Sequence, residues 1–512
     1  MHGFELHVPS IRRLATLLVA ATFAFASFAQ GDPVRGGEIE VALNAQGIRG
    51  LRTWQDNTAN ETHIYTIVYD TFVRYDDDYR IVGGLFESWE SDDAVTWTFQ
   101  VREGVTWHDG VVLTAQHFID FFDAVQDPEM GATTETISLF EGVDYEAVDP
   151  LTIRMVLPEP NAALLDAFSR QWLSRVDGYD ADAPIGTGPF RLVDWRRNEI
   201  MRFEANEAYW RDGLPYLDGL TVRMVPDATT RLNLLLGDEV DVIRSVPMAD
   251  VDRLETMDDV QLVSTPDEFS ISHWYLLFHN PEPALSDVRV RQAINLAIDR
   301  ETLLQVTFGR GVIRSSAIAE GSWAFNPDAR SYNERDVEAA RALMEEAGYD
   351  PGAMELELSL KYWEEWPENP QIAQIIQANL AEIGIAVTLE LLEIGQWVDT
   401  VAFDLNYELA LTALVPSWDP DDQLGNTYQV DDGSALEWVN PAFTEAWVAG
   451  RATADLDERT AAYHEAQAIA MEEEPSADLN GVPAFDAARA DVANIVRYNR
   501  GDIFYERVWL DR

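Results

Sequence analysis

The chain has 512 residues, of which 90 are acidic and 36 basic, and its formal net charge at pH 7 is −54. This length exceeds what one hydrophobic core can organise, so we expect two or three domains. The charge excludes nucleic-acid binding, because phosphate backbones are repelled, and indicates a salty or otherwise demanding extracellular setting. The absence of cysteine excludes disulfides, thiolate metal sites and cysteine nucleophiles.

The first 30 residues have the pattern of a secretory signal peptide. Arg12 and Arg13 precede an apolar run over residues 14–28, and small residues stand at Ser27 and Ala29, where a signal peptidase reads. We expect cleavage after Ala29 and a soluble, secreted mature protein. Because there is no cysteine to carry a lipid, we expect no lipid anchor.

One stretch contains the clearest structural signals of the chain. Hydrophobic and polar residues alternate over residues 95–102, which predicts a half-buried strand. Asp109-Gly110 then predicts a tight turn, and Thr114 can cap a helix whose apolar face covers residues 118–125. His117 stands where a full capping box has Glu or Gln. The stretch therefore predicts a hairpin followed by an amphipathic helix.

Strand and helix patterns continue along the chain. The alternation of the two kinds in the second half predicts an α/β layer with crossover helices. Strands are expected over residues 38–43, 151–157, 190–195, 220–225, 240–243, 274–278, 354–360 and 385–391, and helices over residues 61–72, 226–236, 288–298, 337–347 and 371–382.

A series of short motifs supports a family resemblance. In chain order they are ESWE from Glu87, VREGV from Val101, WHDG from Trp107, LTA from Leu113, GTGP from Gly186, PYLD from Pro215, VDVI from Val240 and DVRVRQA from Asp287. Their order and spacing resemble the peptide/nickel-type solute-binding proteins of ABC importers, family 5, over nearly the whole mature chain. The GTGP turn is not expected to bind phosphate, because Pro189 removes a backbone donor and no third glycine follows at the dinucleotide spacing.

The resemblance implies an α/β fold, namely a two-lobed periplasmic-binding-protein fold of type II (cluster C) with an additional inserted domain in the first lobe. The expected division is residues 1–29 for the signal peptide, 36–70, 188–268 and 482–512 for the first lobe, 71–187 for the inserted domain and 269–481 for the second lobe. The implied function is that of an extracytoplasmic solute-binding component, a monomer that captures an oligopeptide-like solute and delivers it to an ABC permease and its ATPase.

No pattern predicts catalysis, a metal centre or a cofactor. The histidines of the mature chain form no His-x-x-x-His pair, and Lys361, the only lysine, follows Leu360 rather than the glycine of a Walker loop. There is also no Gly-x-Ser-x-Gly elbow. With so many acidic residues, carboxylates lie near one another by chance, so a secreted hydrolase that uses a carboxylate pair stays open as an alternative of another class.

Tryptophans outside the strand alternation are candidates for lining a ligand cleft. Their indole faces can stack on sugars or on peptide side chains, although a single tryptophan belongs to a core more often than to a ligand site. The tryptophans concerned are Trp54, Trp323, Trp363, Trp397 and Trp418.

The loop after an expected strand at residues 409–411 departs from the family pattern. Peptide-binding members have Gly-Trp there and then an Asp that receives the peptide α-ammonium, three residues before an acidic-Pro pair. Here the pair is Asp419-Pro420, the position of that Asp is Pro416, and the Trp position is Ala413. This departure argues against recognition of a free peptide N-terminus, unless Asp419 or Asp421 takes the role. An oligosaccharide or another polar organic solute is therefore an alternative ligand, and nickel is not expected.

Overall fold

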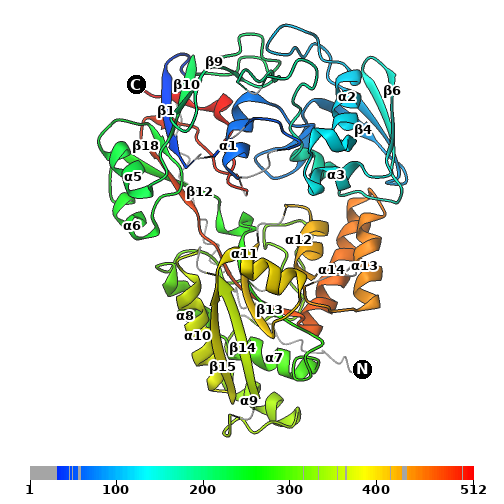
Figure 1. The fold of residues 1–512 in the computed structure, drawn as a ribbon, viewed down its shortest axis with the longest axis vertical. Coiled ribbons are helices and arrows are strands. Elements are labelled where there is room, and N and C mark those ends of the chain that lie inside the picture. Colours follow the sequence, from blue (N-terminus) through cyan, green and yellow to red (C-terminus); the bar gives the residue numbers. More distant parts are fainter. Residues whose placement is uncertain are drawn as a thin grey trace, which may run out of the picture.

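The structure is a computed structural model that describes residues 32–44, 47–48, 50–55, 59–180, 182–314, 316–332, 334–354, 356–363, 366–414, 417–428, 435–498 and 500–512. The expected signal peptide lies outside the described residues. Figure 1 shows two bodies one above the other, with a third group of strands and helices beside the upper body. We call the body on the seven-stranded sheet lobe I, the body on the five-stranded sheet lobe II, and the body on the four-stranded sheet the inserted domain.

Lobe I is built on a mixed sheet in the order β12-β18-β11-β1-β10-β9-β8. Its strands are β1 (Glu38–Leu43), β8 (Phe190–Arg196), β9 (Ile200–Ala205), β10 (Gly219–Met224), β11 (Val242–Ile243), β12 (Val260–Ser264) and β18 (Phe485–Arg489), and its helices are α1 (Ala59–Val68), α5 (Ala228–Leu236) and α6 (Val251–Leu254). Ile39 and Val41 of β1 pack with α1, whereas Ala42 packs with α5 and α6. Both faces of the sheet are therefore covered, as the alternation of side chains along a strand requires.

The inserted domain has an antiparallel sheet in the order β4-β5-β7-β6. Its elements are β4 (Phe86–Glu90), β5 (Thr96–Val101), β6 (Asp144–Asp149), β7 (Thr152–Val156), α2 (Ala115–Gln126), α3 (Thr134–Phe140) and α4 (Leu164–Ser169), with a 3-10 turn at Pro128–Met130. Phe118, Phe121 and Phe122 of α2 pack on Phe72 with ring centroids 5.1–5.9 Å apart. The predicted hairpin-and-helix stretch thus builds an aromatic core.

The start of α2 confirms a predicted helix cap and adds a detail to it. Thr114 is the N-cap residue, and its backbone N–H donates to Nδ1 of His117 at 3.1 Å. The imidazole therefore takes the place of the Glu or Gln carbonyl oxygen of a capping box. The turn before it is also as predicted, since Gly110 has φ of 84° and the N–H of Trp107 donates to the carbonyl of Val111.

Lobe II has a five-stranded sheet in the order β15-β14-β16-β13-β17, with β14 parallel to β15 and β16. The strands are β13 (His273–Phe278), β14 (Leu356–Trp363), β15 (Ile385–Leu392), β16 (Leu409–Leu414) and β17 (Ser476–Gly481). The helices are α7 (Val288–Ala297), α8 (Arg300–Val306), α9 (Val337–Glu346), α10 (Asn369–Ala381), α11 (Ile394–Trp397), a π-helix at Val398–Phe403, α12 (Pro420–Tyr428), α13 (Pro441–Arg451) and α14 (Leu456–Glu473). The predicted strand and helix alternation of this region is confirmed.

Smaller elements complete the described residues. They are the hairpin of β2 (Val73–Tyr75) and β3 (Ile81–Gly83), the pair of β19 (Val492–Ala493) and β20 (Trp509–Leu510), and 3-10 turns at Met248–Asp250, Asp267–Phe269 and Tyr505–Arg507. The chain passes between the sheets of the two lobes twice, from β12 to β13 and from β17 to β18. These two connections are where the lobes can hinge, and the predicted domain boundaries, which fall close to them, stay a prediction.

The expected helix over residues 61–72 ends too late. The structure ends α1 at Val68 because the carbonyl of that residue accepts the N–H of Gly188, from a distant turn. Asp70 is then buried, and its carboxylate accepts hydrogen bonds from Thr187, Tyr209 and Trp210. Hydrogen bonds with distant residues therefore end the helix, although the spacing of its apolar residues predicted a longer one.

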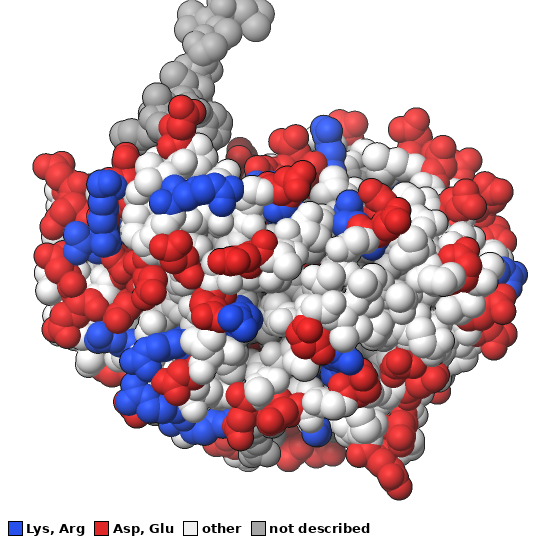
Figure 2. Space-filling model, turned by 90° about the horizontal axis from the view of Figure 1, so that it is seen from above, with Lys and Arg blue, Asp and Glu red and all other residues white. Residues whose placement is uncertain are grey.

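The charge of the sequence lies on the surface. Figure 2 shows acidic side chains spread around the whole outline of the face seen from above, with basic side chains gathered in a few places among them. Many basic groups of the described residues have acidic partners, such as Arg310 with Asp252 and Glu255. On this face the acidic side chains are therefore widely distributed and do not form one patch.

Candidate functional site

A cavity of about 240 Å³ lies at the two connections between the lobes. Its walls come from lobe I, from lobe II and from both connecting segments, and we call it the hinge cavity. It is lined by Ser264, Thr265, Asp267, Ser270, Ser272, Gly311, Trp366, Val482, Pro483, Ala484, Phe485, Arg497 and Arg500. Pockets for drug-sized ligands measure roughly 300–1,000 Å³, so this cavity fits a small solute or one end of a longer one.

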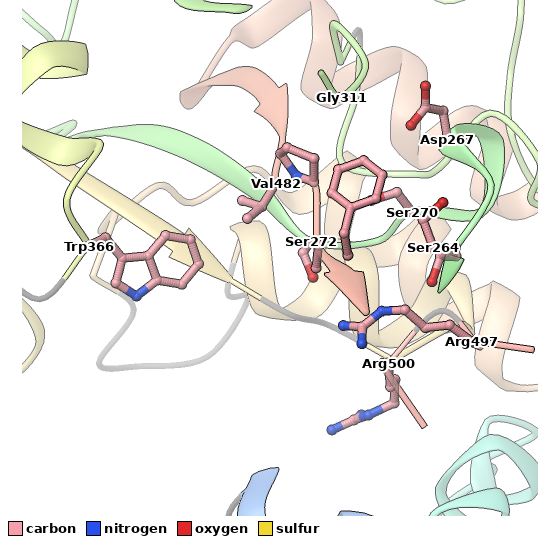
Figure 3. Close-up of a pocket in the computed structure, with 13 residues that line it drawn as sticks. Ser264, Asp267, Ser270, Ser272, Gly311, Trp366, Val482, Arg497 and Arg500 are labelled. Carbon is pink, nitrogen blue, oxygen red and sulfur yellow. The ribbon is translucent and has the colours of Figure 1, made fainter. Parts of the chain in front are cut away.

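The lining of the hinge cavity is polar on one side and aromatic on another. Figure 3 shows the guanidinium groups of Arg497 and Arg500 extending in the same direction, with Ser272 above them and Trp366 across the cavity. Arg497 donates to the carboxylate of buried Asp486 at 2.6 Å, which fixes its position. The cavity thus offers guanidinium and hydroxyl donors together with an indole face.

Trp418 joins the two lobes next to this cavity. It lies 5.0 Å from the ring of Tyr79 and 5.7 Å from that of Phe269, and Tyr79 in turn lies 6.1 Å from Tyr498. With Ile271 and Ala319, these residues form what we call the Trp418 cluster. Trp418 is only 3% exposed, so in this structure the cluster is an apolar contact between lobe II and the body above it.

Asp419, the predicted ligand carboxylate, already has a partner within lobe II. Nη2 of Arg459 donates to both of its oxygens, at 2.8 and 2.9 Å, and Asp419 is 4% exposed. Its carboxylate also accepts the N–H of Asp421 at the start of α12. Burial raises the pKa of Asp419, and the charge of Arg459 opposes this rise. The hydrogen bonds of the Asp419 carboxylate are therefore made within lobe II.

Asp421 is a second buried carboxyl group in this loop. Burial raises its pKa to about 7; the charge of Arg451 lowers it and the charge of Asp419 raises it. The hydroxyl of Tyr463 lies 3.5 Å from its Oδ1 and Nε of Arg451 lies 3.7 Å away. These contacts place Asp421 between α12, α13 and α14, behind the cleft surface.

The inserted domain also touches lobe II near this loop. The N–H of Ala162 donates to the carbonyl of Arg451 at 2.8 Å. Asp166 of α4 accepts the hydroxyl of Tyr75 at 2.6 Å and is close enough to Asp419 to raise the pKa of that group. The carboxylates of the two bodies therefore face each other where the bodies meet.

The other predicted tryptophans lie in several places. Trp54 is completely buried in the core of the inserted domain, 5.8 Å from Phe121, so the structure gives it a packing role there. Trp323 lies under the guanidinium of Arg459, 5.1 Å from it, and thus contacts the Asp419 arrangement. Both lie outside the lining of the hinge cavity.

Trp363 and Trp397 form an edge-to-face pair with ring centroids 4.6 Å apart in the core of lobe II. Our expectation that Trp363 lies outside the strands is wrong, because it is the last residue of β14, where it pairs with Leu392. The indole N–H groups of Trp363, Trp397 and Trp418 are buried and find no acceptor among the described residues. A buried donor without an acceptor is costly, which keeps these residues of interest for ligand binding.

Pro416 lies outside the described residues, so the position of the missing family Asp stays a prediction from the sequence. The described residues contain no group of three or more His, Cys, Asp or Glu side chains that could hold a metal ion. Among the same residues no helix is long and apolar enough to cross a membrane.

Comparison with protein families gives one match that spans most of the chain. The model of the "Bacterial extracellular solute-binding proteins, family 5 Middle" matches residues 80–435. The chain belongs to this family. The match runs from the inserted domain through the loop of Trp418, whereas Tyr79 and the C-terminal side of the hinge cavity lie outside the matched residues.

Relatives of this family 5 protein are similar over most of their length. The dipeptide-binding protein of Escherichia coli K12 is 27% identical over 473 residues, which are 84% of this chain and 86% of the relative. Heme-binding protein A of Haemophilus influenzae is 27% identical over 440 residues, 76% of this chain and 77% of the relative. The solved structure of HbpA2 from Haemophilus parasuis has a TM-score of 0.84 at 21% identity and covers 93% of this chain and 100% of its own. The predicted type II two-lobed fold is thereby confirmed.

Sequence reasoning missed Tyr79, Arg497 and Arg500 of this family 5 protein. Tyr79 has φ of 55° in the turn between β2 and β3, and nothing in its neighbourhood in sequence links it to Trp418. A signal for the arginines exists, because basic residues are few and cluster near the C-terminal end at Arg497, Arg500 and Arg507. Their position at the hinge becomes evident only when β18 returns to lobe I.

Proposed function

We propose that the chain is the extracytoplasmic receptor of an ABC importer, capturing an oligopeptide-like solute between lobes I and II. The hinge cavity carries the proposal, because its lining comes from both lobes and from both connections. A solute held there contacts both lobes, and a ligand shifts a hinged protein toward its closed form only when it binds that form more tightly. The closed form then delivers the solute to a membrane permease, which ATPase subunits on other chains drive.

Two further parts of the proposal concern where and how the protein acts. The mature chain begins after Ala29, carries no lipid anchor and works as a monomer outside the cytoplasm, without metal or cofactor. It binds and releases the solute unchanged. Membership of a family of binding proteins supports this reading over that of a hydrolase.

A peptide ligand is favoured by the relatives, one of which is a dipeptide-binding protein. An oligosaccharide or another polar solute is the second candidate, and one observation favours it. Because Asp419 is paired with Arg459, it does not offer a free carboxylate to a peptide α-ammonium. A peptide bound here is therefore held by other groups.

Mass spectrometry of the protein purified from an extracytoplasmic fraction tests the proposal directly. We expect one solute molecule per chain, of peptide mass, and a saturable change of tryptophan fluorescence when it is added back to the stripped protein. Trp418→Ala should weaken its binding, because the Trp418 cluster holds the lobes together. If the bound solute has the mass of an oligosaccharide, the ligand is not a peptide. If cleavage products are found in place of the intact solute, the protein is a hydrolase and not a carrier.

A further inference from the structure

Arg500 is a cation without a partner in a strongly acidic protein. The sequence has 90 acidic and 36 basic residues, so a basic side chain finds acidic partners easily. Arg500 nevertheless makes no hydrogen bond and no ion pair with any residue that the structure describes. Arg500 is exposed and lines the hinge cavity. A guanidinium held in a cleft without a carboxylate is available to a ligand.

The neighbours of Arg500 explain why it keeps its donors free. Arg497 lies beside it in the cavity, but its guanidinium is bound to Asp486, which also lies 2.9 Å from Nε of Arg244. Burial lowers the pKa of Arg500, and so does the nearby charge of Arg170. The charges of Asp502, Asp166 and Asp422 raise this pKa, but none of the three has a hydrogen bond to Arg500 among the described residues. The guanidinium groups of Arg497 and Arg500 thus extend in the same direction, and that of Arg500 has no hydrogen-bonded carboxylate among the described residues.

The rest of the lining suits an anionic group. The side chains of Ser264, Ser270 and Ser272 contribute hydroxyl donors, and Trp366 contributes an apolar face. The one acidic residue of the lining, Asp267, lies at the far end of the cavity from Arg500 (Figure 3). A guanidinium presents two parallel N–H groups that match the two oxygens of a carboxylate, and such charge-assisted bonds are the strong ones.

We propose that Arg500 binds an acidic group of the solute, so that the transported solutes carry a carboxylate that enters the hinge cavity. The proposal rests on the proposed function and specifies its ligand class. It also accounts for the loop of Asp419, where the acidic group is neutralised by Arg459. Recognition thus depends on the negative end of the solute and not on its positive end.

Peptides with blocked ends test the proposal. The probe is a pool of tetrapeptides, Ala-X-X-Ala, in four forms: free, N-acetylated, C-amidated and blocked at both ends. Their binding is followed by tryptophan fluorescence. We expect the free and N-acetylated pools to bind wild type with affinities within about threefold of each other, and the amidated pools to bind at least about tenfold more weakly, a difference of about 1.4 kcal/mol.

Three variants decide whether Arg500 is responsible. Arg500→Gln should lose at least about tenfold in affinity for the free pool and no longer distinguish it from the amidated pool, while Arg500→Lys should retain part of the preference, since it keeps the charge without the planar fork. Arg154→Gln is the matched control, because it removes the same charge from an exposed position on β7 of the inserted domain. Thermal unfolding of each variant shows that it is folded.

The outcomes separate this proposal from the proposed function. If the amidated pools bind wild type as tightly as the free pool, or if Arg500→Gln keeps the preference, Arg500 is not the carboxylate site although the protein still binds peptides. If no pool binds, peptide capture is wrong, and succinate, glutarate and citrate are titrated beside their neutral amides. Binding of the acids alone, lost in Arg500→Gln, then supports the carboxylate site for another organic acid. If the acids do not bind either, the proposal that Arg500 binds a carboxylate is also wrong.

Discussion

At the scale of single residues, the pair of Asp419 and Arg459 shows how lobe II supports the cleft from behind. The pair is buried and joined by two hydrogen bonds of 2.8 and 2.9 Å. Removing one partner of such a pair leaves a buried charge without compensation, which costs about 3–5 kcal/mol. We expect Arg459→Met to lower the free energy of unfolding by about this amount in urea titrations.

A surface pair provides the control for that measurement. Arg330 and Glu472 lie 3.6 Å apart with 41% and 67% of their side chains exposed. Exposed pairs contribute about 0–1 kcal/mol, so Arg330→Met should change the free energy of unfolding by no more than this. Equal losses in the two variants would contradict the buried role of the Asp419 pair.

Asp421 gives the protein a pH dependence of known sign. Its carboxyl is raised to a pKa of about 7 by burial, whereas an Asp in an unfolded chain has a pKa of about 3.9. Between about pH 4 and pH 7 the folded state therefore binds more protons than the unfolded state, and the free energy of unfolding falls as pH rises. From pH 5 to pH 8 we expect wild type to lose on the order of 2–3 kcal/mol more than Asp421→Asn.

Urea titrations at both pH values measure this difference. Asp404→Asn, which changes an exposed carboxylate of the same lobe, should follow the pH dependence of wild type. Parallel curves for wild type and Asp421→Asn would show that Asp421 does not titrate in this range.

The sequence identified Trp418, Asp419 and Asp421 but none of their partners. Arg459 stands 40 positions after Asp419 on another helix, and Tyr79 reaches Trp418 from the body above. No local pattern encodes such pairs, because they depend on how α12, α14 and the β2-β3 hairpin are placed by the fold. The sequence therefore singled out the loop but did not predict that its side chains are buried and paired.

At the scale of elements, the turn of Gly186 and Gly188 holds α1 in place. A Cβ on Gly186 would lie 1.9 Å from the carbonyl oxygen of Val68, and one on Gly188 would lie 2.5 Å from its carbonyl carbon. Backbone atoms cannot move aside as a side chain can, and overpacking costs about 1–3 kcal/mol or more. We expect Gly186→Ala to lower the thermal unfolding midpoint through a loss at the upper end of that range.

Gly425→Ala is the matched control in helix α12. Its Cβ would make an ordinary contact of 3.4 Å with the ring of Trp447. Alanine is favoured over glycine inside a helix by roughly 0.5–1 kcal/mol, so this variant should be slightly more stable than wild type. A Gly186→Ala protein as stable as Gly425→Ala would refute the close approach.

Elements with strong periodicity were predicted within a few residues. The expected helix at residues 337–347 is α9, Val337–Glu346, and the expected strand at residues 385–391 is β15, Ile385–Leu392. The helix expected over residues 61–72 was too long because a buried Asp70 and the Gly188 turn decide where α1 ends. Periodicity reports which face is apolar, whereas helix ends are often decided by contacts from elsewhere in the chain.

At the scale of the whole molecule, a net charge of −54 opposes compaction, because like charges repel each other. Salt screens such repulsion, since the Debye length falls from about 10 Å at 0.1 M to about 3 Å at 1 M. We expect the thermal unfolding midpoint at pH 7 to rise steadily between 20 mM and 1 M NaCl. The rise should shrink near pH 4.2, the calculated isoelectric point, where carboxylates lose their charge. A midpoint that salt leaves unchanged at pH 7 would contradict adaptation to a salty setting.

Closure of the two lobes depends on the Trp418 cluster, which brings Trp418 of lobe II against Tyr79 and Tyr498 on the other side. Burying large aromatic side chains stabilises a contact by several kcal/mol, and truncation of a buried Trp or Phe costs about 3–5 kcal/mol. Trp418→Ala should therefore move the solute-free protein toward an open form, with a larger radius of gyration in small-angle X-ray scattering.

Tyr79→Ala should have the same effect from the opposite lobe, and the double variant should open the protein no further than either single one, because both changes break one contact. Trp89→Ala is the matched control, since this indole lies on β4 of the inserted domain, outside the Trp418 cluster and the hinge cavity. Its radius of gyration should equal that of wild type. If Trp418→Ala also keeps the wild-type radius, with and without solute, the cluster does not hold the lobes together, and closure depends on the solute in the hinge cavity.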